Sequence, residues 1–329
     1  MTIAELLESV RRVEVRTNRL VTDMMVGAYL SHFKGRGMDF EELREYIPGD
    51  EVRDIDWNVT NRMGRPFVRR YREERELAMV LALDVSASSA FGSLLRTKRE
   101  FAVEIAATLA TSAARSSDKV ALMLFTDQVE LFVPPRKGRR HILRLLREML
   151  SFEPKRRATN IPAALSFLNR VLHQRSVVFL LTDFLHSFGV ASTRRGPAPD
   201  AVQGRRLGAA GLHAASYQPG TGRDTLQEIG LTNARHDLVC VHLHDPRESR
   251  LPAAGLLTIE DAETGELLEI DSSRAAVREK FADTNAERLA ELDRALRRAG
   301  VDTLRFSTAE TFAQTLQRFF ETRRGRRRG

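Results

Sequence analysis

The chain has 329 residues, of which 42% are hydrophobic and 29% charged, a composition typical of a globular protein. Its single cysteine, Cys240, excludes an internal disulfide and a cysteine zinc cluster, and one cysteine fits a reducing compartment. The net charge is +8, but five arginines lie in the acid-free stretch 323–328, and without them it would be +3. The charge therefore does not demand a nucleic-acid-binding groove.

Residues 1–75 are predicted to form an N-terminal accessory segment docked against the domain that follows. Apolar residues recur at three- and four-residue steps over 2–16, which predicts an amphipathic helix. This stretch lacks the apolar core of a signal peptide. The apolar runs around 77–82 and 177–185 are too short to cross a bilayer. We therefore expect a cytoplasmic protein that does not contact a membrane.

From about residue 76 apolar stretches alternate with helical patterns. Strands are predicted at 77–84, 120–127, 129–133, 176–183, 237–244 and 302–307. Helices are predicted near 95–115, 139–150, 161–174, 274–299 and 309–322. This alternation predicts an α/β fold over residues 76–322, with a doubly wound, mostly parallel, Rossmann-like sheet. The short connection before 129–133 indicates an antiparallel edge strand.

Two segments depart from this alternation. Residues 189–235 are rich in Gly, Ala, Pro, Ser and Arg and have weak periodicity, so we predict a flexible insertion there. The Arg-rich tail 323–329 is predicted to be disordered, because a block of like charges repels itself.

Oxygen-bearing side chains follow two of the predicted strands. They are Asp84, Ser86 and Ser88 after the first strand, Asp183 at the end of the fourth, and Thr159 before the helix between them. Ligands bind beyond the carboxyl ends of parallel strands, where the strand order reverses. If the order is 3-2-1-4-5-6, these five side chains converge and suit a hard cation such as Mg²⁺. The alternative is that both aspartates merely cap helices.

The sequence DVSAS at 84–88, the ATN at 158–160 and the strand-ending Asp183 resemble the metal-ion-dependent adhesion site of von Willebrand factor A domains. Ala158 stands where glycine is frequent, and Ser89-Ala90 where a methionine is common, but neither change removes a ligand. In addition, the segments 35–74 and 236–271 resemble the bacterial family called domain of unknown function 58.

This resemblance covers about residues 30–320, apart from the insertion. It implies a von Willebrand factor A-like fold and a Mg²⁺ or Mn²⁺ ion held by Asp84, Ser86, Ser88 and Thr159, with Asp183 supporting the ion directly or through a water. It also implies an adaptor or chaperone-like function, in which an Asp or Glu of a partner protein completes the coordination. The partner that the family suggests is a MoxR-type AAA+ ATPase or a client of such an ATPase. Some relatives carry transmembrane helices, which this chain lacks.

Other functional classes are less favoured by the sequence. It has no Walker A loop, HExxH, GxSxG or dinucleotide-binding glycine pattern, so we do not expect an enzyme. A metal-dependent phosphate-ester hydrolase that uses the same cation remains an alternative. A nucleic-acid-binding protein that uses the basic tail is another. However, the arginine clusters at 136–140, 155–157 and 323–328 have no interleaved aromatic residues, so nucleic acid is not the favoured partner.

Two further clusters have both a functional and a structural interpretation. Asp50, Asp54, Asp56 and Trp57 could form a partner surface or a second ion site. We favour a structural role, in which Trp57 packs against the sheet and the acids pair with arginines such as Arg44. His242 and His244 share a strand face with Leu238 and Cys240, and no third ligand is evident, so we expect structural histidines.

Overall fold

The computed structural model describes residues 37–48, 50–74, 78–93, 96–185, 206–207 and 222–326. Its centre is a six-stranded sheet with the strand order β11-β8-β6-β3-β4-β5. The strands are β3 (Ala78–Asp84), β4 (Lys119–Phe125), β5 (Val129–Arg136), β6 (Val177–Thr182), β8 (Asp237–His244) and β11 (Asp302–Ser307). Neighbouring strands are parallel except for the antiparallel edge pair β4–β5. The predicted fold class, edge strand and strand order are thus confirmed.

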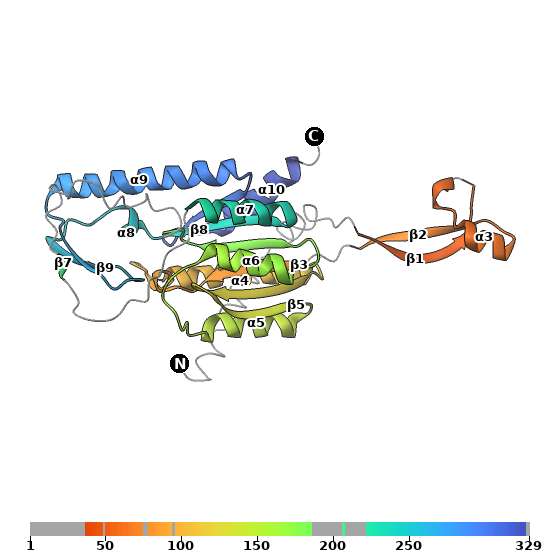
Figure 1. Ribbon diagram of the computed structural model, residues 1–329, viewed down its shortest axis with the longest axis horizontal. Coiled ribbons are helices and arrows are strands. Elements are labelled where there is room, and N and C mark those ends of the chain that lie inside the picture. Colours follow the sequence, from red (N-terminus) through yellow and green to blue (C-terminus); the bar gives the residue numbers. More distant parts are fainter. Residues whose placement is uncertain are drawn as a thin grey trace.

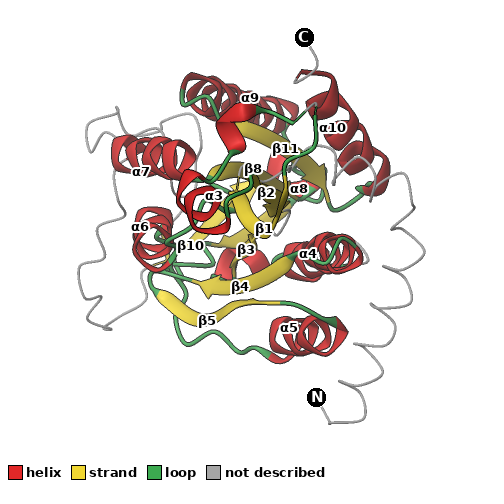
Figure 2. Cartoon of the chain, turned by 90° about the vertical axis from the view of Figure 1, so that its right-hand side faces the viewer, coloured by secondary structure: helices red, strands yellow, loops and turns green. Residues whose placement is uncertain are grey.

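Helices cover both faces of this sheet (Figure 2). One face packs against α4 (Lys98–Arg115), α5 (Arg139–Ser151) and α10 (Ala313–Arg326). The other packs against α6 (Ile161–Val171), α7 (Gly222–Arg235) and α9 (Ala275–Arg298). Because both faces are buried, β3, β4 and β6 are apolar along almost their whole length instead of alternating. None of the described helices is long and apolar enough to cross a membrane.

A second, three-stranded sheet lies beyond the carboxyl ends of the central strands (Figure 1). It consists of β7 (Arg206–Leu207), β10 (Leu267–Asp271) and β9 (Leu256–Glu260), in that order. Strands β9 and β10 form an antiparallel hairpin in which Glu260 pairs with Leu267. The sequence analysis did not predict this hairpin, which follows the short helix α8 (Pro246–Ser249).

The described part of the N-terminal segment forms a separate hairpin of β1 (Gly37–Glu45) and β2 (Phe67–Glu74). Between them lie the short 3-10 helix η1 (Val52–Asp54) and the helix α3 (Trp57–Met63). Figure 1 shows this hairpin away from the central sheet, at the end opposite β9 and β10, and not docked against the sheet. The helix predicted at 2–16 lies outside the described residues.

The acidic cluster of this segment has local roles. Asp56 caps α3 by accepting hydrogen bonds from the backbone N–H groups of Asn58 and Val59. Asp50 pairs with Arg44 at 2.6 Å, as predicted. The prediction for Trp57 was wrong, because its side chain is 61% exposed instead of packing against the sheet.

Two segments that were predicted to be irregular contain helix. The insertion predicted at 189–235 ends in α7, where Ile229 and Thr232 are buried and Asn169 of α6 donates a hydrogen bond to the Thr232 hydroxyl at 2.9 Å. Likewise α10 continues to Arg326, into the tail that was predicted to be disordered. Tertiary contacts explain this continuation, because Arg323 pairs with Asp237 and Asp302 at 2.7 and 2.5 Å.

The two histidines of β8 are part of the packed interior. The His242 ring lies 6.0 Å from the ring of Phe184 and 5.8 Å from that of His244, measured between centroids. Within the described residues, no three His, Cys, Asp or Glu side chains are grouped so that they could hold a metal ion. His242 is thus packed between the rings of Phe184 and His244. Burial, with a smaller contribution from Arg305, lowers the pKa of His242 to about 3.

This low pKa predicts a loss of stability in acid. Below pH 6.5 an unfolded histidine takes up a proton, whereas His242 in the folded chain stays neutral down to about pH 3. The unfolded state then binds more protons, so the free energy of unfolding should fall as the pH falls through this window. In His242→Leu, the slope between pH 6 and 4.5 should be shallower by about 1.4 kcal/mol per pH unit.

Urea unfolding at several pH values measures this slope. The exposed His173 offers a matched control, because its replacement by Leu removes an imidazole that is not buried. If the free energy of unfolding depended on pH equally in the wild type and in His242→Leu, the low pKa of His242 would be contradicted.

Candidate functional site

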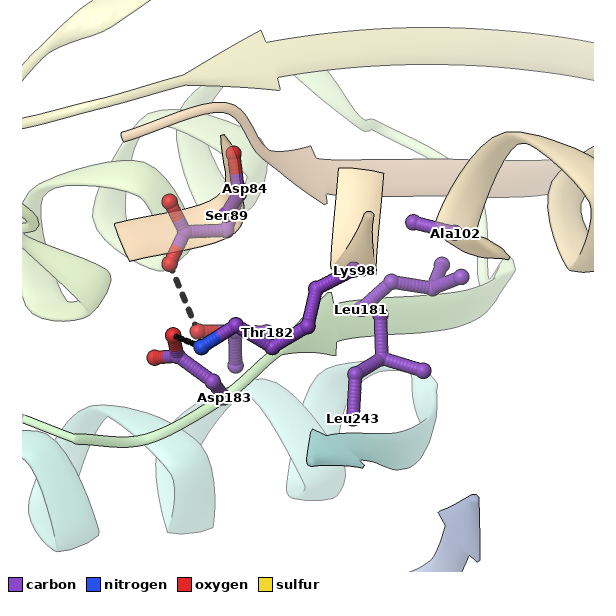
Figure 3. Close-up of a pocket in the computed structure, with 8 residues that line it drawn as sticks. All are labelled: Asp84, Ser89, Lys98, Ala102, Leu181, Thr182, Asp183 and Leu243. Carbon is purple, nitrogen blue, oxygen red and sulfur yellow. Dashed lines mark hydrogen bonds and ion pairs between the residues drawn. The ribbon is translucent and has the colours of Figure 1, made fainter. Parts of the chain in front are cut away.

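The carboxyl ends of β3 and β6 lie side by side and bring two aspartates together. Leu83 pairs with Leu181 in the parallel ladder, so Asp84 and Asp183 follow at the same edge of the sheet. Thr182 joins the two strands further, because its hydroxyl donates a hydrogen bond of 2.6 Å to Asp84 Oδ2 (Figure 3). The structure thus brings Asp84 and Asp183 together at the edge of the sheet where the sequence predicted the five side chains to converge.

The loop after β3 places two serine hydroxyls beside this edge. Asp84 Oδ1 accepts a hydrogen bond of 2.9 Å from the backbone N–H of Ser86, which turns the chain back toward the carboxylate. The hydroxyl oxygens of Ser86 and Ser88 are 3.2 Å apart. The Ser89 hydroxyl stabilises this turn by donating a hydrogen bond of 2.7 Å to the Ser86 carbonyl. Asp84, Ser86 and Ser88 therefore form one compact group of oxygen atoms.

A third loop holds Thr159 close to the loop after β3. The backbone N–H of Ala87 donates to the carbonyl of Arg157 at 2.9 Å and joins the two loops directly. The backbone N–H of Asn160 donates to the carbonyl of Thr126 at the end of β4, also at 2.9 Å, and the Asn160 side chain caps α6. These hydrogen bonds hold Arg157 and Asn160, which flank Thr159 in the sequence, and so keep Thr159 beside the loop after β3.

Lys98, the first residue of α4, is a member of the site that the sequence analysis missed. Its side chain is only 1% exposed, and its ammonium donates to Asp183 Oδ2 at 2.6 Å (Figure 3). The same ammonium also donates to Glu248. Although burial opposes both charges, the pairing raises the pKa of Lys98 and lowers that of Asp183. Asp183 Oδ1 meanwhile accepts from the backbone N–H of Leu185 at 3.1 Å. Because the Lys98 ammonium already offsets the charge of Asp183, this carboxylate is better suited to contact a cation through a water than to bind it directly.

Asp84, in contrast, has no cationic partner among the described residues. It is 4% exposed, and its hydrogen-bond donors, the Thr182 hydroxyl and the Ser86 N–H, are neutral. Burial, together with the charge of Asp183, raises the pKa of Asp84 to about 7. A buried carboxylate normally has a cation or a metal beside it. The donor set of Asp84 with Ser86, Ser88 and Thr159 therefore fits a hard divalent cation, which prefers oxygen ligands and needs only one or two carboxylates.

Glu263, in the turn between β9 and β10, is a second member that the sequence did not indicate. Its Oε1 atom accepts a hydrogen bond of 2.8 Å from the Thr159 hydroxyl. Burial and the negative charge of Asp183 raise the pKa of Glu263 to about 7, although the bond from Thr159 opposes this shift. A third carboxylate thus lies against the predicted donor set.

These geometric features accompany a clear family relationship. The sequence matches the family described as "Protein of unknown function DUF58" over residues 42–202 and 216–291. The chain belongs to this family. Uncharacterized proteins of Mycobacterium bovis and Mycobacterium tuberculosis are each 27% identical to it over 322 residues, which is 97% of this chain and 90% of the relative.

Solved structures of similar fold include BatB from Bacteroides thetaiotaomicron, with a TM-score of 0.43 and 11% identity over 75% of this chain and 98% of that chain. The VWA domain of SpRpn10 has a TM-score of 0.34 and 10% identity over 73% of this chain and 93% of that chain.

The buried ion pairs of Lys98 predict a large loss of stability in Lys98→Met. The buried Asp183 and the partly buried Glu248 would lose their cation, and breaking a buried ion pair costs about 3–5 kcal/mol. Arg297→Met is the matched control, since Arg297 pairs with Asp293 at 3.9 Å on an exposed helix face and should contribute less than about 1 kcal/mol. Denaturant unfolding of both variants measures the difference, and a Lys98→Met variant as stable as Arg297→Met would rule out this role for the ion pairs.

Proposed function

We propose that this DUF58 protein is a non-enzymatic interaction module that binds a partner protein through a divalent cation, Mg²⁺ or Mn²⁺. Asp84, Ser86, Ser88 and Thr159 hold the cation, and Asp183 supports it through a water. The bound cation supplies a positively charged coordination position for an Asp or Glu side chain of the partner. The observation that carries this proposal is the buried Asp84 carboxylate beside two serine hydroxyls, without a cationic partner among the described residues.

The charge balance of the site supports this type of binding. Lys98 already offsets Asp183, so Asp84 is the remaining negative charge of the predicted ligand set. Serine and threonine hydroxyls are neutral and leave a divalent ion with excess positive charge. Such an ion attracts a further carboxylate strongly, because little water is present to screen it.

The family resemblance suggests which partner to test. We propose a MoxR-type AAA+ ATPase, or a client that such an ATPase remodels, and we place the encounter in the cytoplasm. The chain would then act as an adaptor whose affinity for its partner depends on the cation.

Calorimetric titration with Mg²⁺ and Mn²⁺ tests the cation site. The wild type should bind one ion, and the double variant Asp84→Ala, Ser86→Ala should bind at least about 100-fold more weakly, because the donor set loses its carboxylate and one of its hydroxyls. Ser151→Ala is the matched control, because the exposed Ser151 hydroxyl bonds to the Arg147 carbonyl at the end of α5, outside the proposed site. Equal binding by all three proteins, or no binding by the wild type, would contradict the proposal.

The same proteins extend the test to the partner. A purified MoxR-type ATPase should bind the wild type and the Ser151→Ala control with Mn²⁺ present, and EDTA should abolish the binding. Deletion of residues 324–329 should leave the affinity unchanged and retains Arg323, which anchors α10. Binding that ignores EDTA but is lost on this deletion would indicate the basic tail instead.

A further inference from the structure

The turn between β9 and β10 brings a carboxylate of this chain to the proposed cation site. Glu263 lies 104 residues after Thr159 in the sequence, yet its Oε1 atom is 2.8 Å from the Thr159 hydroxyl oxygen. The turn is well ordered by its own hydrogen bonds. Asp261 Oδ1 accepts from the backbone N–H groups of Glu263 and Thr264, both at 2.9 Å, and the Asp261 backbone pairs with Glu266. The position of Glu263 is therefore set by the turn.

A second set of contacts joins this turn to the loops of the site. The Arg157 guanidinium donates to the carbonyl of Ala262 at 3.1 Å and lies 3.5 Å from Glu260. The carbonyl of the same Arg157 accepts from Ala87, which lies between Ser86 and Ser88. One residue thus connects the turn to the loop after β3 without the help of the Glu263 carboxylate.

The proposed ligands are almost completely shielded from solvent when the β9–β10 turn lies against them. Ser86 is 1% exposed, Asp84 and Ser88 are 4%, Asp183 is 6% and Thr159 is 7%. A carboxylate that approaches from another molecule cannot reach these oxygens unless something moves. The chain's own Glu263, however, already lies against Thr159.

From this geometry we infer that Glu263 is an intramolecular ligand of the cation site and occupies the position that a carboxylate of the partner takes. This inference rests on the proposed function. The partner then binds by replacing Glu263, and the β9–β10 turn moves away when it does so.

Glu263 competes with a partner carboxylate for the cation at an advantage, because Glu263 is tethered to the site by its own chain. A carboxylate on a short turn competes at an effective concentration in about the millimolar range or above, so a weak external carboxylate does not displace it. The contacts of Arg157 that hold the turn are solvent-exposed, with 62% of its side chain accessible, and such contacts contribute little. A partner with additional contacts can therefore open the turn at a small cost.

Mn²⁺ titration by calorimetry on the full chain, with and without about 50 mM acetate, tests the inference. Three variants are compared with the wild type: Glu263→Gln, Glu263→Ala and the matched control Glu266→Gln. Glu266 lies in the same turn region with an exposed side chain. Glu263→Gln keeps an acceptor for the Thr159 hydroxyl but loses the charge, so its affinity for Mn²⁺ should fall about tenfold.

Acetate provides the decisive comparison. It should restore most of the lost affinity to Glu263→Ala, where it can enter the vacated position, and should leave the wild type and Glu266→Gln unchanged. If Glu263→Gln binds Mn²⁺ as tightly as the wild type, or more tightly, Glu263 is not a ligand and the inference fails, while the cation site itself stands. If the wild type shows no Mn²⁺ binding that depends on Asp84, both the proposed function and the inference fail.

Discussion

The burial of two aspartates at adjacent strand ends is the constraint on which the rest of this site depends. Asp84 and Asp183 follow the parallel strands β3 and β6, and both are less than 7% exposed. Two negative charges in so little solvent require compensation. For Asp183 the compensation comes from Lys98 at the start of α4, which also reaches Glu248 in α8. For Asp84 only neutral donors are present among the described residues, and this asymmetry is the basis on which we propose a cation there.

The sequence predicted those parts of the structure that are encoded locally. Continuous apolar runs revealed strands buried on both faces, and the polar residues that end them marked the edge where Asp84, Thr159 and Asp183 meet. Lys98, Glu248 and Glu263 could not be predicted, because each reaches the site from a different element through contacts that span 85 to 150 residues of sequence. A lysine at the start of a helix, or a glutamate in a hairpin turn, has the same local pattern whether it faces solvent or a buried acid.

The same distinction explains the helices α7 and α10. Composition suggested irregular chain in both places, yet Thr232 is buried against α6, and Arg323 is held by two aspartates at strand beginnings. Tertiary contacts stabilise a helix that local propensity alone does not indicate. Trp57 shows the opposite error, since a large aromatic side chain was expected in a core and is instead exposed on α3, away from the central sheet. The proposed cation site, the β9–β10 turn and Lys98 lie at one end of the central sheet, whereas the N-terminal hairpin extends from the other.

The most direct test of the central claim is anomalous diffraction from crystals of the full chain soaked in Mn²⁺. We expect one strong anomalous peak within about 2.3 Å of oxygens of Asp84, Ser86, Ser88 and Thr159, with the ammonium of Lys98 still on Asp183. A peak that also lies within bonding distance of a Glu263 oxygen would support Glu263 as the intramolecular ligand. Crystals that contain Mn²⁺ elsewhere but show no peak between these oxygens would contradict the claim, and Asp84 would then be a structural side chain held by Thr182 and Ser86 alone.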